Sequence, residues 1–111
     1  MDIQPSNAII VLMTAPTADE ANRIADLLVN RKLAACVQVL PEMDSVYMWE
    51  GEVQREREVL ILAKTNRQKF VDLEREVRKT HSYETPEIIA VPVEAASEPY
   101  LDWLTSCLDG S

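Results

Sequence analysis

The side chains of this chain that could bind a soft metal ion are few and far apart in the sequence. There are two cysteines, Cys36 and Cys107, and a single histidine, His81. Thiolate and imidazole groups are suitable ligands for copper, and methionine thioethers suit Cu(I). No C-x-x-C or H-x-H spacing, of the kind found in dedicated metal sites, joins these residues. The residue types therefore allow a copper site, while their spacing alone does not predict one.

The same residues support nucleophilic catalysis poorly. A Ser-His-Asp arrangement cannot be placed around the single histidine. Cys36 and His81 would form a nucleophile and base only if two subunits brought them together. We therefore expect that the protein is not an enzyme.

Charged residues alternate along residues 50–58, which read EGEVQRERE. On an exposed strand, such arginines and glutamates form cross-strand pairs that discourage pairing with other chains. The four glutamates in this run leave a low-affinity cation patch open as the alternative.

A long hairpin over residues 34–65 must position many of these side chains. Its two extended segments flank a turn at Glu50-Gly51, and β-branched residues alternate along the first segment. Fully extended, residues 34–49 would span about 50 Å, whereas a usual strand has about 5–6 residues. Tyr47, Met48 and Trp49 near the tip form an apolar patch typical of an interface. We expect other copies of the chain to complete the hairpin. The alternative is two shorter strands broken at Pro41, with the aromatic residues folded back onto the body.

The other segments predict two further strands and three helices. Residues 8–13 (AIIVLM) form an apolar run typical of a strand buried on both faces. A capping box at residues 17–20 (TADE) opens a helix, with Glu20 reaching back to the cap and lying on the outer face. Asn66 can cap a second helix. Pro92 places the strand at residues 88–93 on a sheet edge, and a third helix starts near residue 97.

This order of elements predicts the α+β class. It matches the ferredoxin-like βαββαβ pattern, an antiparallel sheet backed by two helices, with an extra C-terminal helix and a long hairpin between the second and third strands. The strand order would be 4-1-3-2, so that the second and fourth strands are opposite edges. Because both follow a helix, we expect both to begin at the same end of the sheet. Cys36 and residues 81–87 would then lie about 14 Å apart, three strand spacings, and could share a ligand only between subunits.

Length and composition set further limits. A chain of 111 residues with two glycines and no low-complexity segment predicts one domain over residues 1–111. The net charge of −8 argues against binding to nucleic acid, because that binding depends on Lys and Arg. The apolar runs are far shorter than the roughly 20 residues that a membrane helix needs. The N-terminus does not resemble a secretory signal, and the cysteines form no disulfide framework, so we expect a cytoplasmic protein with reduced thiols.

Five segments occur together in an order and spacing that resemble a known family. They are residues 34–37 (AACV), 45–51 (SVYMWEG), 64–65 (KT), 81–89 (HSYETPEII) and 100–104 (YLDWL). The combination is similar to the CutA family of divalent-cation-tolerance proteins and covers nearly the whole chain. The chain departs from the family at Ser82, where proline is usual, which leaves the backbone before Tyr83 less restricted. It also has AAS at residues 95–97, where a glycine is common.

The resemblance implies a homotrimer, assembled through long hairpins and edge strands, and two candidate sites. The first is an inter-subunit site for copper or another divalent metal, with Cys36, His81 and Glu84 as ligands. The second is a cleft near the subunit junction that could hold a small anionic or zwitterionic ligand, formed by Trp49, Lys64, Tyr83 and Glu84.

Structural roles are the alternative for each of these residues. Cys36 would then be a small buried strand residue, and His81 would cap the end of the preceding helix. Tyr83 and Trp49 would pack the trimer contact, with Lys64 paired to Glu84.

Three functions are compatible with these residues and with the resemblance. The first is a cytoplasmic homotrimer that takes part in the response or tolerance to divalent metal ions. The second is a trimeric small-molecule sensor that uses the cleft, by analogy with nitrogen-regulatory signal proteins of the same fold. The third is a trimeric scaffold for another protein, with no direct role for metal.

Overall fold

The computed structural model describes residues 7–109. The elements follow one another in a β-α-β-β-α-β-α order, with a single 3-10 turn at Arg67–Lys69 before the second helix. Their bounds are β1 Ala8–Ala15, α1 Ala18–Asn30, β2 Cys36–Trp49, β3 Glu52–Asn66, α2 Phe70–Thr80, β4 Ile88–Pro92 and α3 Glu98–Leu108. Within the described residues, no helix is both long and apolar enough to span a membrane.

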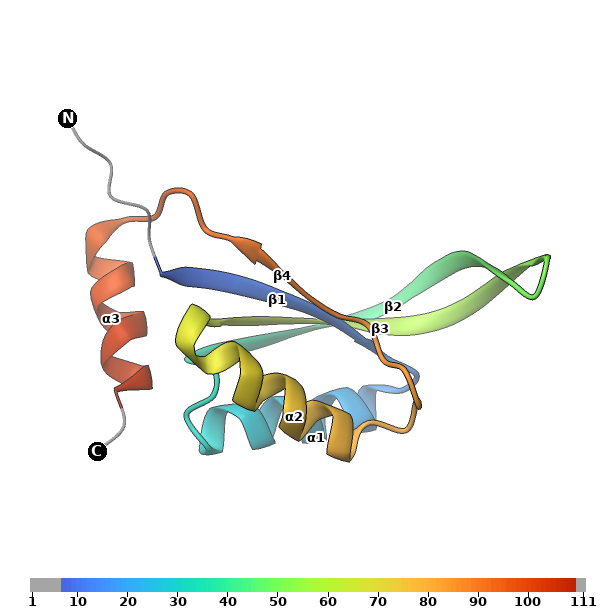
Figure 1. Cartoon of the computed structure of the whole chain (residues 1–111), viewed down its shortest axis with the longest axis horizontal. Helices are drawn as coiled ribbons and strands as arrows, with labels where there is room; N and C mark the ends of the chain where they lie inside the picture. The colour runs from blue at the N-terminus through green and yellow to red at the C-terminus, as the bar shows by residue number, and fades with distance from the viewer. Residues whose placement is uncertain (1–6, 110–111) are drawn as a thin grey trace.

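The strands form one antiparallel sheet in the order β2-β3-β1-β4. Helices α1 and α2 lie side by side on one face, while α3 stands at the end of the sheet opposite the hairpin tip (Figure 1). This arrangement confirms the predicted α+β class and strand order, and it places Pro92 on an edge strand as expected.

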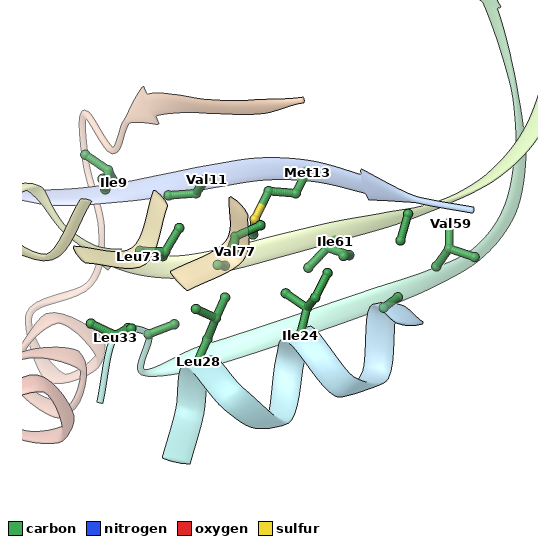
Figure 2. Packing of buried hydrophobic residues seen from close by; sticks show 14 residues of the cluster. Ile9, Val11, Met13, Ile24, Leu28, Leu33, Val59, Ile61, Leu73 and Val77 are labelled. Atoms are coloured by element: carbon green, nitrogen blue, oxygen red, sulfur yellow. The ribbon is translucent and has the colours of Figure 1, made fainter. Parts of the chain in front are cut away.

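The core lies between the sheet and the two helices. Met13 and Ile61 point from the sheet toward Ile24 and Leu28 of α1, and all four side chains are fully buried (Figure 2). Leu73 and Val77 of α2 close the same layer. Alternate residues of each strand face this layer because side chains alternate across a strand.

The hairpin of β2 and β3 projects well beyond the rest of the sheet (Figure 1). Strand β2 continues through Pro41 with a shift of register between Leu40 and Met43, so the alternative of two separate strands is wrong. At the tip, Glu50 and Gly51 have φ angles of 49° and 79°. Two positive φ angles in a two-residue loop are those of a type I′ turn, whose twist suits a hairpin.

Exposed ion pairs join the two strands of the hairpin. Arg57 lies 2.7 Å from Glu42 and 3.5 Å from Asp44. These contacts confirm the predicted cross-strand charge pairing, and their exposure means that each contributes little to stability.

The face of the sheet opposite α1 and α2 is largely apolar, and we call it the open face. The strand registers place its residues in three rows across the sheet: Cys36, Lys64, Ile10 and Val91; Gln38, Leu62, Leu12 and Ile89; and Leu40, Leu60 and Thr14. Leu40, Ile89 and Val91 are 41%, 54% and 42% exposed. The sequence predicts that β1 is buried on both faces. Ile10 and Leu12 are only half-buried, so this prediction is wrong for the open face.

The expectation that β2 and β4 begin at the same end of the sheet is wrong. Strand β2 pairs antiparallel with β3, which pairs antiparallel with β1, and β4 is antiparallel to β1. Strands β2 and β4 therefore run in opposite directions and begin at opposite ends. Cys36 lies in the row of Ile10, whereas His81 contacts Thr14, four residues further along β1.

Candidate functional site

The loop of residues 81–87 carries three of the predicted site residues and joins α2 to β4. It begins at His81, which is the C-cap of α2 and donates its backbone N–H to the carbonyl of Val77. The His81 side chain is fully buried. Its capping position agrees with the structural role considered from the sequence.

Both ring nitrogens of His81 have partners inside the chain. Nδ1 lies 3.0 Å from the backbone N–H of Tyr83, which can only donate. Nδ1 is therefore the acceptor, and Nε2 carries the proton and donates it to the carbonyl of Thr14 at 2.7 Å. A metal ion at either nitrogen would have to displace one of these hydrogen bonds.

Glu20 of α1 also holds this loop, through contacts with Ser82. It is buried, with 6% of its surface exposed, so its predicted place on the outer face of α1 is wrong. The threonine half of the capping box is present, since Thr17 accepts a hydrogen bond from the N–H of Glu20. The Glu20 carboxylate, however, accepts hydrogen bonds from the N–H and the hydroxyl of Ser82 at 2.9 and 3.0 Å.

The environment of Glu20 favours its ionised form. Burial opposes ionisation, but the two hydrogen bonds from Ser82, with smaller electrostatic contributions from neighbouring groups, outweigh it. The pKa of the Glu20 carboxyl is therefore lowered below its ordinary value.

Tyr83 crosses from the loop to the base of the hairpin. Its hydroxyl donates to Oε2 of Glu58 at 3.1 Å, and Glu58 is itself buried with 8% of its surface exposed. Burial, followed by the charge of Glu58 and this hydrogen bond, raises the pKa of Tyr83 to about 12. On the neighbouring strand, a hydrogen bond to Glu56 raises the pKa of Tyr47 as well.

A cleft lies between this loop and the projecting hairpin. It is lined by three aromatic residues, Tyr47, Trp49 and Tyr83, by four glutamates, Glu56, Glu58, Glu84 and Glu87, and by Thr14, Ser45, Val46, Gln54, Ser82 and Thr85. The structure therefore brings together three of the four residues predicted for the ligand cleft. Among the described residues, the lining contains no Lys, Arg or His, so the cleft of a single chain suits a cation better than an anion.

Lys64 is the predicted cleft residue that the structure places elsewhere. It lies in the row of Cys36, at the other end of the open face. Its ammonium group sits 5.4 Å from the centre of the Tyr100 ring of α3, within the range of a cation–π contact. Within a chain, Lys64 thus contacts α3 and does not pair with Glu84.

The three predicted metal ligands are not gathered within one chain. Cys36 is half-buried at the start of edge strand β2, and His81 and Glu84 are near the opposite end of the sheet. Among the described residues, no group of three or more His, Cys, Asp or Glu side chains is arranged to hold a metal ion. A site that uses all three would need more than one subunit.

Glu20 and Glu58 are the residues of this region whose roles the sequence does not reveal. The capping-box pattern assigns Glu20 to the helix terminus, and the alternating charges assign Glu58 to the exposed ribbon. The available signal for Glu58 is its position next to the apolar run that starts at Val59, where the hairpin enters the core.

The chain matches known proteins over most of its length. Residues 9–107 match the family described as CutA1 divalent ion tolerance protein. A "Divalent-cation tolerance protein CutA" of Thermus thermophilus is 43% identical over 95 residues, which cover 86% of this chain and 92% of the relative. "Protein CutA, chloroplastic" of Arabidopsis thaliana is 40% identical over 97 residues, which cover 87% of this chain but only 53% of that longer protein.

Solved structures agree with this relationship. The divalent cation tolerance protein (Cut A1) from Thermus thermophilus superposes with a TM-score of 0.86 at 42% identity, covering 87% of this chain and 94% of the other. The family match and the relatives above 30% identity lead to one conclusion. The chain belongs to the CutA1 divalent ion tolerance protein family.

Proposed function

We propose that the protein acts as a cytoplasmic homotrimer in the response or tolerance to divalent metal ions, as a binding protein and not an enzyme. The metal role is supported by membership of the CutA1 family and by the names of its relatives. The cytoplasmic location is proposed from the sequence alone. The relatives do not share one compartment by name, because one of them is named as chloroplastic.

The open face is the observation that supports assembly into a homotrimer. It presents exposed Leu40, Ile89 and Val91 beside half-buried leucines, and it lies on the side of the sheet that α1 and α2 do not cover. The hairpin tip adds Val46, Met48 and Trp49, which are 53%, 64% and 62% exposed. Apolar patches of this kind mark protein interfaces. Among the described residues, β2 and β4 are the edges of the sheet, and edge strands present backbone groups that can pair with another copy.

Copper or another divalent metal would bind between subunits, with Cys36, His81 and Glu84 as the candidate ligands. Cys36 points to the open face and Glu84 is exposed in the cleft. Thiolate and carboxylate donors, with imidazole, form a set that borderline and soft divalent ions accept. His81 fits least well, because both of its ring nitrogens already have partners. The proposal therefore depends most on Cys36.

Calorimetric titration of the reduced protein with Cu(I) and with Cu(II) tests this site. Cys36→Ser and Glu84→Gln should each weaken copper binding at least about tenfold, since each replaces an anionic donor of a small ligand set by a weaker neutral one. Cys107→Ser is the matched control, because Cys107 is the other half-buried free thiol and lies on α3. Equal binding by the Cys36 and Cys107 variants would reject Cys36 as a ligand.

The cleft supports a second function, that of a trimeric sensor of a small molecule. The supporting observation is that Trp49, Tyr83 and Glu84 line one cleft between the loop and the hairpin. A thermal-shift screen of amines and carboxylates would test it, with Tyr83→Phe and Trp49→Ala as the variants. A shift that both variants abolish would favour the sensor over the metal role. A trimer that responds to neither metal nor small molecules would favour the scaffold.

A further inference from the structure

The cleft depends on a loop without regular secondary structure, residues 81–87. We propose that Glu20 of α1 is the positioning residue of this cleft, and that it holds Tyr83 and Glu84 in place through Ser82. The inference builds on the proposed use of the cleft, but the geometry that it describes can be tested without any ligand.

One oxygen of Glu20 is the centre of the arrangement. Oε2 accepts the Ser82 N–H at 2.9 Å and the Ser82 hydroxyl at 3.0 Å. It also lies 3.2 Å from Nδ1 of His81, but both atoms are acceptors there, so this contact is not a hydrogen bond. Hydrogen bonds to a charged acceptor are about twice as strong as neutral ones. Ser82 itself is exposed, so these bonds tie a surface residue of the loop to a buried group of α1.

Tyr83, the residue after Ser82, is held in addition by His81. The backbone N–H of Tyr83 is fixed by Nδ1 of His81 at 3.0 Å, and the two rings pack with their centres 4.8 Å apart. The hydroxyl of Tyr83 then reaches Glu58 on β3. The loop is thus held by α1 on one side and by the base of the hairpin on the other. Glu84, the next residue, enters the cleft from this fixed backbone.

The position of Glu20 at the start of α1 explains why a carboxylate is retained there. Burial of an ionised carboxylate is costly unless hydrogen bonds or charges compensate for it. The first turn of α1 supplies compensation, since the positive end of the helix dipole favours an anion. The side chain is not needed to cap the helix, because Thr17 already does so. Glu20 is therefore free to bind the loop.

Amide hydrogen exchange at single-residue resolution tests the proposal on the full chain. In Glu20→Ala, the amides of Ser82 and Tyr83 should exchange at least about tenfold faster, as expected when a hydrogen bond to a charged group is lost. Amides of β1 should keep their rates. Asp19→Ala is the matched control, because Asp19 is the exposed acidic neighbour in the same helical turn and should leave the loop unchanged.

Two further variants keep the test valid if Glu20→Ala folds poorly. Ser82→Ala removes only the hydroxyl donor from an exposed position and should accelerate exchange at Tyr83 by a smaller factor. Glu20→Gln keeps an acceptor without the charge and should partly restore the rates. Unchanged exchange at Ser82 and Tyr83, or an equal increase at β1, would overturn the positioning role.

A second readout in the cleft separates positioning from general stabilisation. Release of the loop should weaken the contact between the His81 and Tyr83 rings, whose centres lie 4.8 Å apart, and nuclear Overhauser effects between the two rings report on it. Ring contacts that persist in Glu20→Ala would count against the proposal. Copper titration of the same variants tests the proposed function separately. If the loop is loosened in a protein that binds no copper, the metal role is rejected and the role of Glu20 stands.

Discussion

Tyr83 donates a hydrogen bond to Glu58 at 3.1 Å, and this contact joins the loop after α2 to the strand from which the hairpin projects. Glu58 pairs with Met43, directly after the register shift in β2, and the next residue of β3 is the buried core residue Val59. The contact therefore lies where the hairpin leaves the core. It connects the cleft to the β2–β3 hairpin, which we propose takes part in the assembly of the subunits.

Glu58→Gln should lower the pKa of Tyr83. The value of about 12 arises first from burial and then from the charge and hydrogen bond of Glu58, with smaller contributions from Glu56 and Tyr47. Removal of the Glu58 charge should therefore reduce the upward shift of the pKa without abolishing it. Ultraviolet absorbance titration, with Tyr83→Phe subtracted to isolate this phenol, measures the change. Glu52→Gln, an exposed glutamate near the hairpin tip, is the control. An unchanged pKa in Glu58→Gln would contradict the assignment.

Glu20 should contribute a pH-dependent part of the stability. Its pKa is lower in the folded chain than the ordinary value, so its contribution is present above the unfolded pKa, about 4.3, and is lost as the pH falls through the folded pKa. Denaturant midpoints measured from neutral pH to about one unit below this value should therefore fall less steeply for Glu20→Gln than for the natural chain. Identical slopes would show that Glu20 is not stabilised in its ionised form.

A charge on the open face should disrupt assembly. Ile89→Glu places a carboxylate in the apolar row of Leu12 and Leu62, where it would be buried without a partner if two copies meet there. Val71→Glu is the matched control, because Val71 is 69% exposed on α2, the helix that lies on the opposite face of the sheet. Light scattering after size exclusion should show a smaller species for the first variant only. Equal masses for the two variants would exclude the centre of the open face from the interface.

The hairpin turn should be weakened by Gly51→Ala. Gly51 has a φ of 79°, which L side chains rarely adopt, while a Cβ atom there would meet nothing within 4 Å. The cost is therefore conformational only, about 1 kcal/mol. Glu50→Asn should act in the opposite direction, since Asn-Gly is the preferred pair of a type I′ turn. The pair next to the turn, Trp49 and Glu52, is the hydrogen-bonded one, because pairs alternate along an antiparallel ladder. Hydrogen exchange of these two amides reports both changes, and equal rates in the two variants would contradict this account.

Local sequence patterns were sufficient for the elements of the fold. Alternation along residues 34–40, the Thr17 cap and the Glu50-Gly51 turn all depend on near neighbours in the chain, and the structure confirms each of them. Asn66 is also a cap, but it caps the 3-10 turn that precedes α2, whose own N-cap residue Lys69 makes no side-chain cap. The order of these elements then restricts the sheet to few topologies, which is why the strand order was predictable.

The candidate site was predictable only in part, because its contacts join segments far apart in the sequence. Trp49, Tyr83 and Glu84 meet in one cleft, whereas Lys64 lies against Tyr100. The error about the ends of β2 and β4 has a simple origin: both strands follow helices, but α1 and α2 follow strands that run in opposite directions.

By itself, the sequence determined the α+β class, the long hairpin and the residue types available for metal or ligand binding. Only the tertiary structure decided which of those side chains are free to act. From the sequence, Glu20 has the pattern of a helix cap and His81 is either a metal ligand or a helix cap. In the structure both side chains are buried and form hydrogen bonds with distant segments of the chain. A buried polar group must find hydrogen-bond partners, and those partners come from whichever distant segment the packing places beside it.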